Sequence, residues 1–328
     1  MTAEEIEHFE KELWKRIQVL NSIIWENRAI KPKVDDWLRN FSETDERLMA
    51  LYLLSEFMYF GDSQMRTLLK ALYRDLYRYP IVREIRKANA DTLDISIIEN
   101  QFKNELLSTR FLGIGNPSES GAHLLYFFRQ ENNLSKKNFI NSYEIFSKEN
   151  KNVKELVFLD DFCGSGEQVS TDKSLADFIK SIKLTHPAAR VDYLMLVGTA
   201  TGIAKIRSTG LFSNVESVIT LDGSFKIFGA NSRYFQNVSL PFILDQVRDF
   251  ARKYGYVLTD KICYKAGCVD FPERNACASS NALGFSDCQL LLGFHHNTPD
   301  NTLPIIWYDE KDYAWTPIFK RYNKKYNF

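Results

Sequence analysis

The sequence predicts an α/β protein in which a mainly parallel, open sheet follows an N-terminal helical region. Residues 1–108 carry apolar side chains at three- and four-residue steps, the spacing of amphipathic helices. Residues 109–328 instead alternate short apolar runs with helical stretches, a pattern typical of strands joined by crossover helices. We therefore expect a helical region over 1–108 and an α/β domain over 109–328.

The N-terminal region is expected to hold three main helices. An apolar stripe from Ile6 to Ile24 indicates the first, and Asp45–Phe60 is expected to form the second. Gln64–Tyr79 is expected to form the third, which Pro80 should end. No catalytic motif occurs in this region, so its predicted role is a surface for partner proteins.

The remainder of the chain supplies the predicted strands and their crossover helices. Short apolar runs between polar or small residues indicate the strands, and amphipathic stretches between them indicate the helices. The expected strands are 110–115, 156–162, 193–199, 217–221, 289–294 and 304–308, and the expected helices lie near 122–130, 168–182 and 241–254.

Charge and hydropathy exclude several classes of protein. The 42 Lys and Arg residues balance 42 Asp and Glu residues. The chain therefore has no overall attraction to nucleic acid or an anionic membrane, although a local basic groove that binds nucleic acid is compatible with this balance. The longest apolar run, Leu48–Phe60, is far shorter than the about 20 residues that span a bilayer. The charged N-terminus does not resemble a signal peptide.

The cysteines indicate neither a zinc site nor a disulfide scaffold. There are five of them, they are widely spaced, and no CxxC pair occurs. Zinc sites need closely paired ligands, which these spacings do not supply. We therefore expect reduced thiols, most of them buried, in a cytoplasmic protein without a resident metal.

The most informative segment is Glu155–Gln168, which reads ELVFLDDFCGSGEQ. An apolar strand ends in Asp160 and Asp161, and a small-residue loop then leads into a helix. Backbone N–H groups in such a loop, at the carboxyl edge of a parallel sheet, can bind an anion. Carboxylates beside a bound phosphate must bind hydroxyls or a cation, and a sugar phosphate with a vicinal diol satisfies both requirements.

This segment resembles the phosphoribosyl-pyrophosphate loop of type I phosphoribosyltransferases. The resemblance implies that Asp160 and Asp161 act in catalysis by holding the ribose hydroxyls, with Mg²⁺ on the pyrophosphate. It also implies that six loop residues hold the 5-phosphate: Cys163, Gly164, Ser165, Gly166, Glu167 and Gln168. The family usually has two threonines at Gly164 and Ser165, a small residue at Glu167 and a threonine at Gln168.

Two further segments strengthen the resemblance. A second small-residue loop precedes the helix near Ala122, and a comparable loop in the family contacts the pyrophosphate through the positions Ser118, Glu119, Ser120 and Gly121. A polar segment from Phe294 to Trp307 supplies His295 and Asn297 as candidate contacts to substrate. Together the motifs resemble phosphoribosyltransferase-like proteins of bacterial conflict systems, which implies a role in antiphage defence beside other proteins.

Two alternatives remain open. The departures at Glu167 and Gln168 are compatible with an inactive subunit that senses a nucleotide or binds a partner. Asp161–Gly166 also resembles the first motif of S-adenosylmethionine-dependent amino-methyltransferases. That family has a second motif of Asp/Asn-Pro-Pro-aromatic type, and this chain lacks such a tetrapeptide.

Overall fold

The computed structural model describes residues 2–114, 120–236, 240–310 and 313–322, and it divides the chain into two compact units. Unit 1 combines residues 1–62 with 222–328, and unit 2 comprises residues 63–221. The predicted division at residue 108 does not coincide with this one. The first 62 residues pack with the C-terminal third, whereas the helices after them pack with the sheet. Hydropathy periodicity reports which face of a helix is buried and not which partner buries it.

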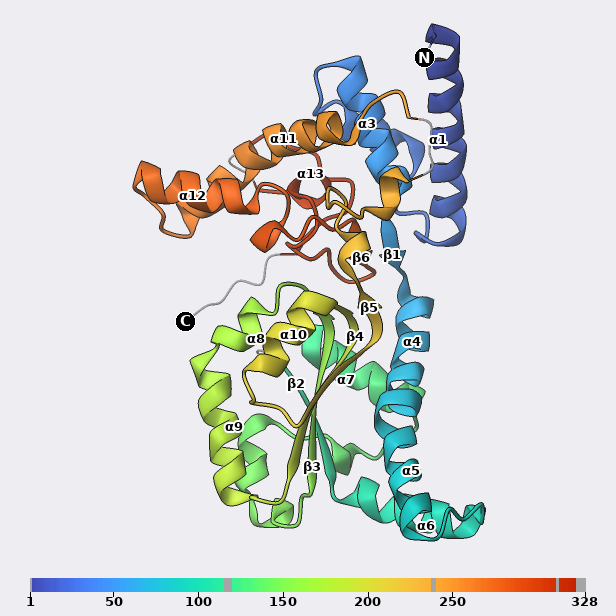
Figure 1. Ribbon diagram of the computed structural model, residues 1–328, viewed down its shortest axis with the longest axis vertical. Coiled ribbons are helices and arrows are strands. Elements are labelled where there is room, and N and C mark those ends of the chain that lie inside the picture. Colours follow the sequence, from blue (N-terminus) through green and yellow to red (C-terminus); the bar gives the residue numbers. More distant parts are fainter. Residues whose placement is uncertain (1, 115–119, 237–239, 311–312, 323–328) are drawn as a thin grey trace. The chain divides into compact units, whose positions relative to one another are not determined.

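Unit 2 is built on a parallel four-stranded sheet in the order β2-β3-β4-β5 (Figure 1). Each strand pairs with the next strand in the chain, and Gly113 at the end of β2 lies opposite Leu159 of β3. The four strands confirm the predicted mainly parallel open sheet. Their bounds are Thr109–Gly113 (β2), Glu155–Cys163 (β3), Arg190–Thr199 (β4) and Asn214–Leu221 (β5).

Helices cover both sides of this sheet. On one side, Ile179 and Ile206 from two helices pack against Phe158 and Tyr193 of the central strands. On the other side, Tyr77 packs its ring on Phe111 of β2. Figure 1 shows α9 and α5 on opposite sides of the strands. The helices are α4 (Asp62–Ala71), α5 (Tyr79–Ala88), α6 (Ile95–Leu107), α7 (Ser120–Glu131), α8 (Glu167–Thr171), α9 (Lys173–Thr185) and α10 (Ala200–Ser208).

Unit 1 is mainly helical around one large apolar core. Its two short strands pair in parallel, with Tyr59 opposite Gly293. Tryptophan and phenylalanine side chains such as Trp25, Trp37 and Phe41 fill the core and are fully buried. Its elements are α1 (Ala3–Ile23), α2 (Lys31–Leu38), α3 (Thr44–Ser55), β1 (Met58–Phe60), α11 (Leu244–Lys265), α12 (Phe271–Asn281), β6 (Leu292–Phe294) and α13 (Pro304–Trp307).

Four local predictions were wrong, each for a physical reason. Residues 58–60 form a strand because they pair with β6 across the chain. Pro80 does not end a helix, because it lies in the first turn of α5, where its missing N–H is not needed. Asp172 divides the predicted helix 168–182, because its side chain caps α9. Residues 304–307 form a short buried helix, and periodicity cannot separate a buried strand from a buried helix in so short a run.

A disulfide joins Cys263 of α11 to Cys277 of α12, which corrects the prediction of reduced thiols. The two helices pack against each other, so cysteines 14 positions apart meet with a Cα–Cα distance of 6.1 Å. Cys163, Cys268 and Cys288 are free thiols. The cytoplasmic location stays a prediction.

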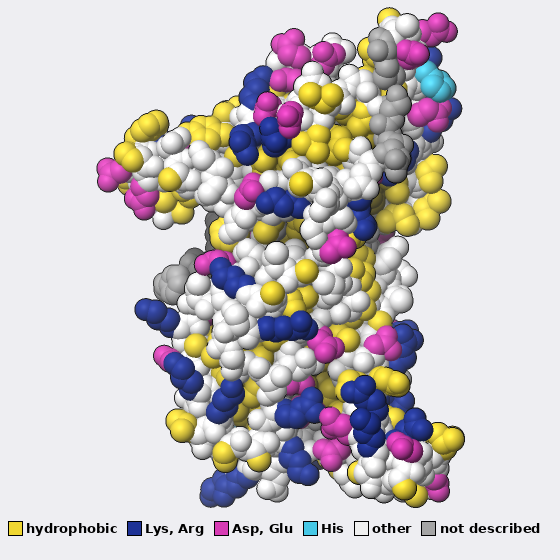
Figure 2. Space-filling view, viewed as in Figure 1, with side chains coloured by type: hydrophobic (Ala, Val, Ile, Leu, Met, Phe, Trp, Pro, Cys, Tyr) yellow, Lys and Arg dark blue, Asp and Glu magenta, His cyan; other side chains and the backbone are white. Residues whose placement is uncertain are grey.

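Two further expectations concern the surface. Among the described helices, none combines the length and apolar character that a membrane crossing requires. Basic and acidic side chains both occur on the visible face of each unit (Figure 2), in keeping with the balanced sequence.

Candidate functional site

The double-acid segment lies where the sequence predicted, at the carboxyl end of a central strand. Strand β3 ends at Cys163, residues 164–166 form a loop, and α8 begins at Glu167. Asp160 and Asp161 are half-buried, in contrast to the fully buried residues 156–159 before them. The carboxyl ends of β2, β3 and β4 meet at this edge of the sheet, so the loops that follow them start from one place.

Asp160 is held in a fixed orientation by two donors. The Tyr193 hydroxyl of β4 donates to Asp160 Oδ2 at 2.6 Å, and the Asp161 backbone N–H donates to Asp160 Oδ1 at 2.9 Å. Burial, with Asp160 adding to it, raises the pKa of Tyr193 well above its usual range, so this phenol stays a donor. The carboxylate therefore keeps one orientation, and its oxygens are acceptors of the kind that bind hydroxyl groups.

The loop after β3 is shaped by close backbone contact with the start of α10. Gly166 has a φ of +72°, which favours glycine, and a Cβ there would lie 2.6 Å from the Gly202 carbonyl oxygen. A Cβ on Gly202 would lie 2.1 Å from the Gly164 carbonyl oxygen. Thr199 adds a hydrogen bond of 2.5 Å from its hydroxyl to that same oxygen. The loop after β3 is thus locked against the end of β4 and the start of α10.

The locked loop presents hydrogen-bond donors. Among the residues that the structure describes, none accepts a hydrogen bond from the backbone N–H of Ser165, Gly166 or Gln168. The Ser165 hydroxyl accepts from the Glu167 N–H at 3.3 Å and remains half-buried. Unpaired N–H groups gathered in one loop are the feature that binds phosphate oxygens elsewhere in proteins.

Side chains of the loop differ in how they can contribute. The Cys163 thiol packs in the apolar core, so this residue can meet a ligand only through its backbone. Glu167 forms an ion pair with Lys205 of α10, which offsets the negative charge that departs from the family pattern. Gln168 is exposed at the start of α8. The loop offers an anion chiefly backbone donors and one serine hydroxyl.

The other predicted site residues belong to other segments of the chain. Ser118 and Glu119 are outside the described residues, and Ser120 and Gly121 form the first turn of α7. His295 and Asn297 belong to unit 1, whereas the loop after β3 belongs to unit 2. The Asn297 side-chain oxygen accepts from the backbone N–H groups of Thr298 and Tyr322, both at 2.9 Å, and so joins this segment to the end of the described chain.

Sequence reasoning missed the contribution of β4 and the start of α10. Tyr193, Thr199, Gly202 and Lys205 each contact the double-acid strand or its loop. A signal was present, because Gly198–Gly202 reads GTATG and repeats the pattern of strand, small residues and helix. Two such segments on adjacent parallel strands must meet at one edge.

The chain matches the family model described as PRTase-CE over residues 34–321. The match covers most of the chain and extends over both units, so the protein belongs to this phosphoribosyltransferase-like family. This confirms the resemblance on which the fold and site predictions were built, and it favours that resemblance over the methyltransferase one. No curated protein and no solved structure matches the chain.

Proposed function

We propose that the protein binds the ribose 5-phosphate part of phosphoribosyl pyrophosphate, or of a nucleotide, at the loop after β3. The unpaired N–H groups of Ser165, Gly166 and Gln168 are the single observation that carries this proposal. They would donate to the phosphate oxygens. Asp160, oriented by Tyr193, and its neighbour Asp161 would accept from the ribose hydroxyls.

Magnesium fits this site as part of the substrate. Mg²⁺ usually binds one or two carboxylates, substrate phosphates and several waters. Within the described part of the chain, no three His, Cys, Asp or Glu side chains gather as a metal cage. Asp160 and Asp161 are the carboxylates that precede the loop on β3, and the bound ion would supply charge neutralisation at the pyrophosphate.

If the protein is an enzyme, the reaction is displacement of pyrophosphate from ribose C1 by an acceptor. Positive charge develops at C1 as the bond to pyrophosphate breaks, so positioning and charge stabilisation matter more than a strong nucleophile. The two aspartates would orient the ribose and stabilise that charge. Residues 118–121, after β2, remain the predicted contact for the leaving group.

Calorimetry with phosphoribosyl pyrophosphate and Mg²⁺ tests the binding. We expect the wild type to bind and Asp160→Ala/Asp161→Ala to lose at least about tenfold in affinity, since a hydrogen bond to a charged group contributes about 1.5–3 kcal/mol. Asp177→Asn is the matched control, because Asp177 is exposed on α9 and pairs only locally with Lys180. Undiminished binding by the double variant would contradict the proposal.

A catalytically silent subunit is the second candidate. Its motivating observation is Glu167, whose carboxylate occupies a loop position where the family has a small residue and is paired with Lys205. Such a subunit would bind the same ligand without turnover. Release of pyrophosphate with any of a panel of bases and nucleotides would rule it out.

We further propose that the protein serves antiphage defence, as an effector or accessory subunit beside other proteins. The resemblance to phosphoribosyltransferase-like proteins of conflict systems supports this. Plaque counts on bacteria that carry the gene with its neighbours test it. Protection that is present with the wild type and absent with Asp160→Ala/Asp161→Ala is the expected result, and equal plaque counts with and without the gene would contradict it.

A further inference from the structure

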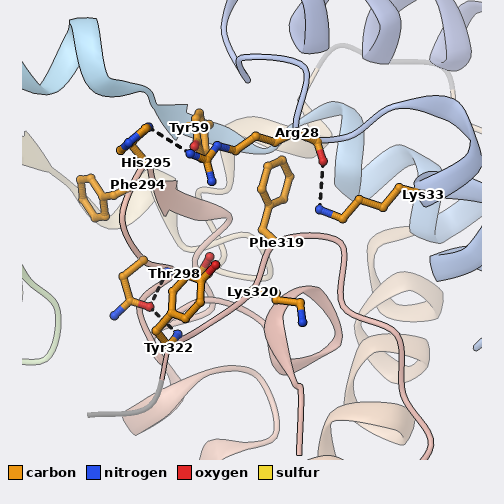
Figure 3. A pocket seen from close by; sticks show the side chains of 10 residues that line it. Arg28, Lys33, Tyr59, Phe294, His295, Thr298, Phe319, Lys320 and Tyr322 are labelled. Carbon is orange, nitrogen blue, oxygen red and sulfur yellow. Dashed lines mark hydrogen bonds between the residues drawn. The ribbon is translucent and has the colours of Figure 1, made fainter.

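Unit 1 contains a pocket that the ribose-phosphate proposal does not use (Figure 3). Its volume is about 200 Å³, below the roughly 300 Å³ at which sites for drug-sized ligands begin. Segments far apart in the sequence line it, from the loop after α1 to the end of the described chain. Six of its residues define the candidate site: Arg28, Lys33, Tyr59, His295, Phe319 and Lys320.

The lining is positively charged. Arg28, Lys33 and Lys320 contribute three cations, and none of the lining residues that the structure describes is acidic. Two of the cations have carboxylate partners outside the lining, since Arg28 lies 3.7 Å from Glu26 and Lys320 lies 2.9 Å from Asp309. Within the described ranges, Lys33 makes no ion pair, and its ammonium group donates to the Arg28 carbonyl at 2.9 Å.

The cations also act on one another. Burial, followed by the charges of Arg28 and Lys320, lowers the pKa of Lys33. His295 adds a further polar group, with Nδ1 3.2 Å from the Arg28 guanidinium (Figure 3). The same nitrogen lies 2.8 Å from Glu26. An anion among these groups would offset the repulsion between the three cations.

Tyr59 supplies an independent observation. Its side chain is 5% exposed, and its hydroxyl has no hydrogen-bond partner among the residues described. The ring stacks on Phe319 with centroids 5.3 Å apart, which fixes its position beside the pocket. Burial raises the pKa of Tyr59, so the hydroxyl remains a donor, and a buried donor without an acceptor is a group that a ligand can satisfy.

We propose that this pocket is an anion site for a phosphate group, either free or carried by a small organic molecule. Lys33, Arg28 and Lys320 supply the charge, and the Tyr59 hydroxyl donates to a phosphate oxygen. The Phe319 ring forms an apolar wall for whatever the phosphate carries. The pocket belongs to unit 1 and the loop after β3 to unit 2, and the proposal does not depend on the function proposed for that loop.

Calorimetry on the full chain tests the site with inorganic phosphate, phenyl phosphate and, as an uncharged reference, phenol. We expect both phosphates to bind, phenol not to bind, and salt to weaken binding. Tighter binding of phenyl phosphate would favour an organic ligand, and equal binding would favour free phosphate. Absence of binding by both phosphates would overturn the proposal.

Two variants assign the binding to this pocket. Lys33→Met and Tyr59→Phe should each lower affinity at least about tenfold, in line with hydrogen bonds to a charged group. Lys31→Met is the matched control, because Lys31 is exposed on the same helix and pairs with Asp35. Tyr59→Phe should leave the melting temperature unchanged or higher, since it removes an unpaired hydroxyl. Phosphate binding that is undiminished in both variants would belong to another site and overturn the proposal.

Discussion

The two ends of the sheet in unit 2 both carry acidic residues, and they use them differently. At the carboxyl end, Asp160 and Asp161 are half-buried beside a loop with unpaired N–H groups. At the amino end, Glu155 and Asp192 are buried on adjacent strands, with Arg190 close to both. Acidic residues in a strand therefore indicate a site only where a loop with free donors follows them.

Burial favours the protonated form of the two carboxyls at the amino end. It raises the pKa of Glu155 to about 7, with Asp192 adding to the effect and Arg190 opposing it. It also raises the pKa of Asp192. These carboxyls form a buried polar cluster with Thr109 and Tyr77. Glu155, Asp192, Thr109 and Tyr77 are all buried, so we assign the cluster to the interior of the unit.

The largest expected effect concerns the glycine contact at the carboxyl end. Gly202→Ala would place a Cβ 2.1 Å from the Gly164 carbonyl oxygen, and we expect it to lower the free energy of unfolding by about 3 kcal/mol. Gly223→Ala is the control, because its added Cβ meets no atom within 4 Å. Urea denaturation measures both. Equal stability of the two variants would mean that the loop after β3 is not locked against the start of α10.

The next effect concerns the pH dependence of stability at the amino end. Below about pH 4.5 Glu155 is protonated in both the folded and the unfolded chain. Between pH 4.5 and 7 the unfolded chain loses this proton while the folded chain keeps it, so the wild type loses stability as the pH rises. Glu155→Gln should reduce the loss between pH 5 and pH 8 by about 2 kcal/mol, since one pKa unit corresponds to about 1.4 kcal/mol.

Urea denaturation at the two pH values measures this prediction. Glu149→Gln, in an exposed residue of the same unit, is the matched control and should leave the pH dependence as it is in the wild type. A Glu155→Gln profile that runs parallel to the wild type would show that Glu155 does not hold its proton on folding.

A smaller effect, on ligand affinity, distinguishes the carboxyl end of the sheet from the amino end. Tyr193→Phe removes one of the two donors that orient Asp160. It should weaken binding of phosphoribosyl pyrophosphate about three- to tenfold, less than the full value of a hydrogen bond to a charged group, because Asp160 itself remains. Asp192→Asn, on the same strand but at the amino end, should leave that affinity unchanged. Calorimetry on both variants measures this difference. An equal loss of affinity in the two would show that the two ends of the sheet do not differ in binding.

The smallest effect concerns the ion pair between Glu167 and Lys205. Both side chains are 41% exposed, so Lys205→Met should change stability by less than about 1 kcal/mol. It should weaken phosphate-ester binding a few-fold, because it leaves a carboxylate unneutralised beside the loop. Adding Glu167→Gln to Lys205→Met should restore affinity. Failure to do so would show that the charge of Glu167 does not affect phosphate binding.

Much of the fold could be predicted from local pattern. The four strands of the sheet follow from short apolar runs, and the double-acid loop follows from an apolar strand that ends in two aspartates and two nearby glycines. The short strand 58–60, the helix at Pro304 and the disulfide between Cys263 and Cys277 could not be predicted in this way. Each depends on a partner that lies outside its own segment.

By itself the sequence determined the α/β class, the place of the acidic strand and the family resemblance, because each is written in neighbouring residues or in a short period. Only the tertiary structure decided that Tyr193 orients Asp160, that Gly166 meets Gly202, and that Arg28 and Phe319 line one pocket. The reason is physical. Backbone periodicity sets which face of an element is buried, whereas packing between distant segments sets which side chains meet on that face.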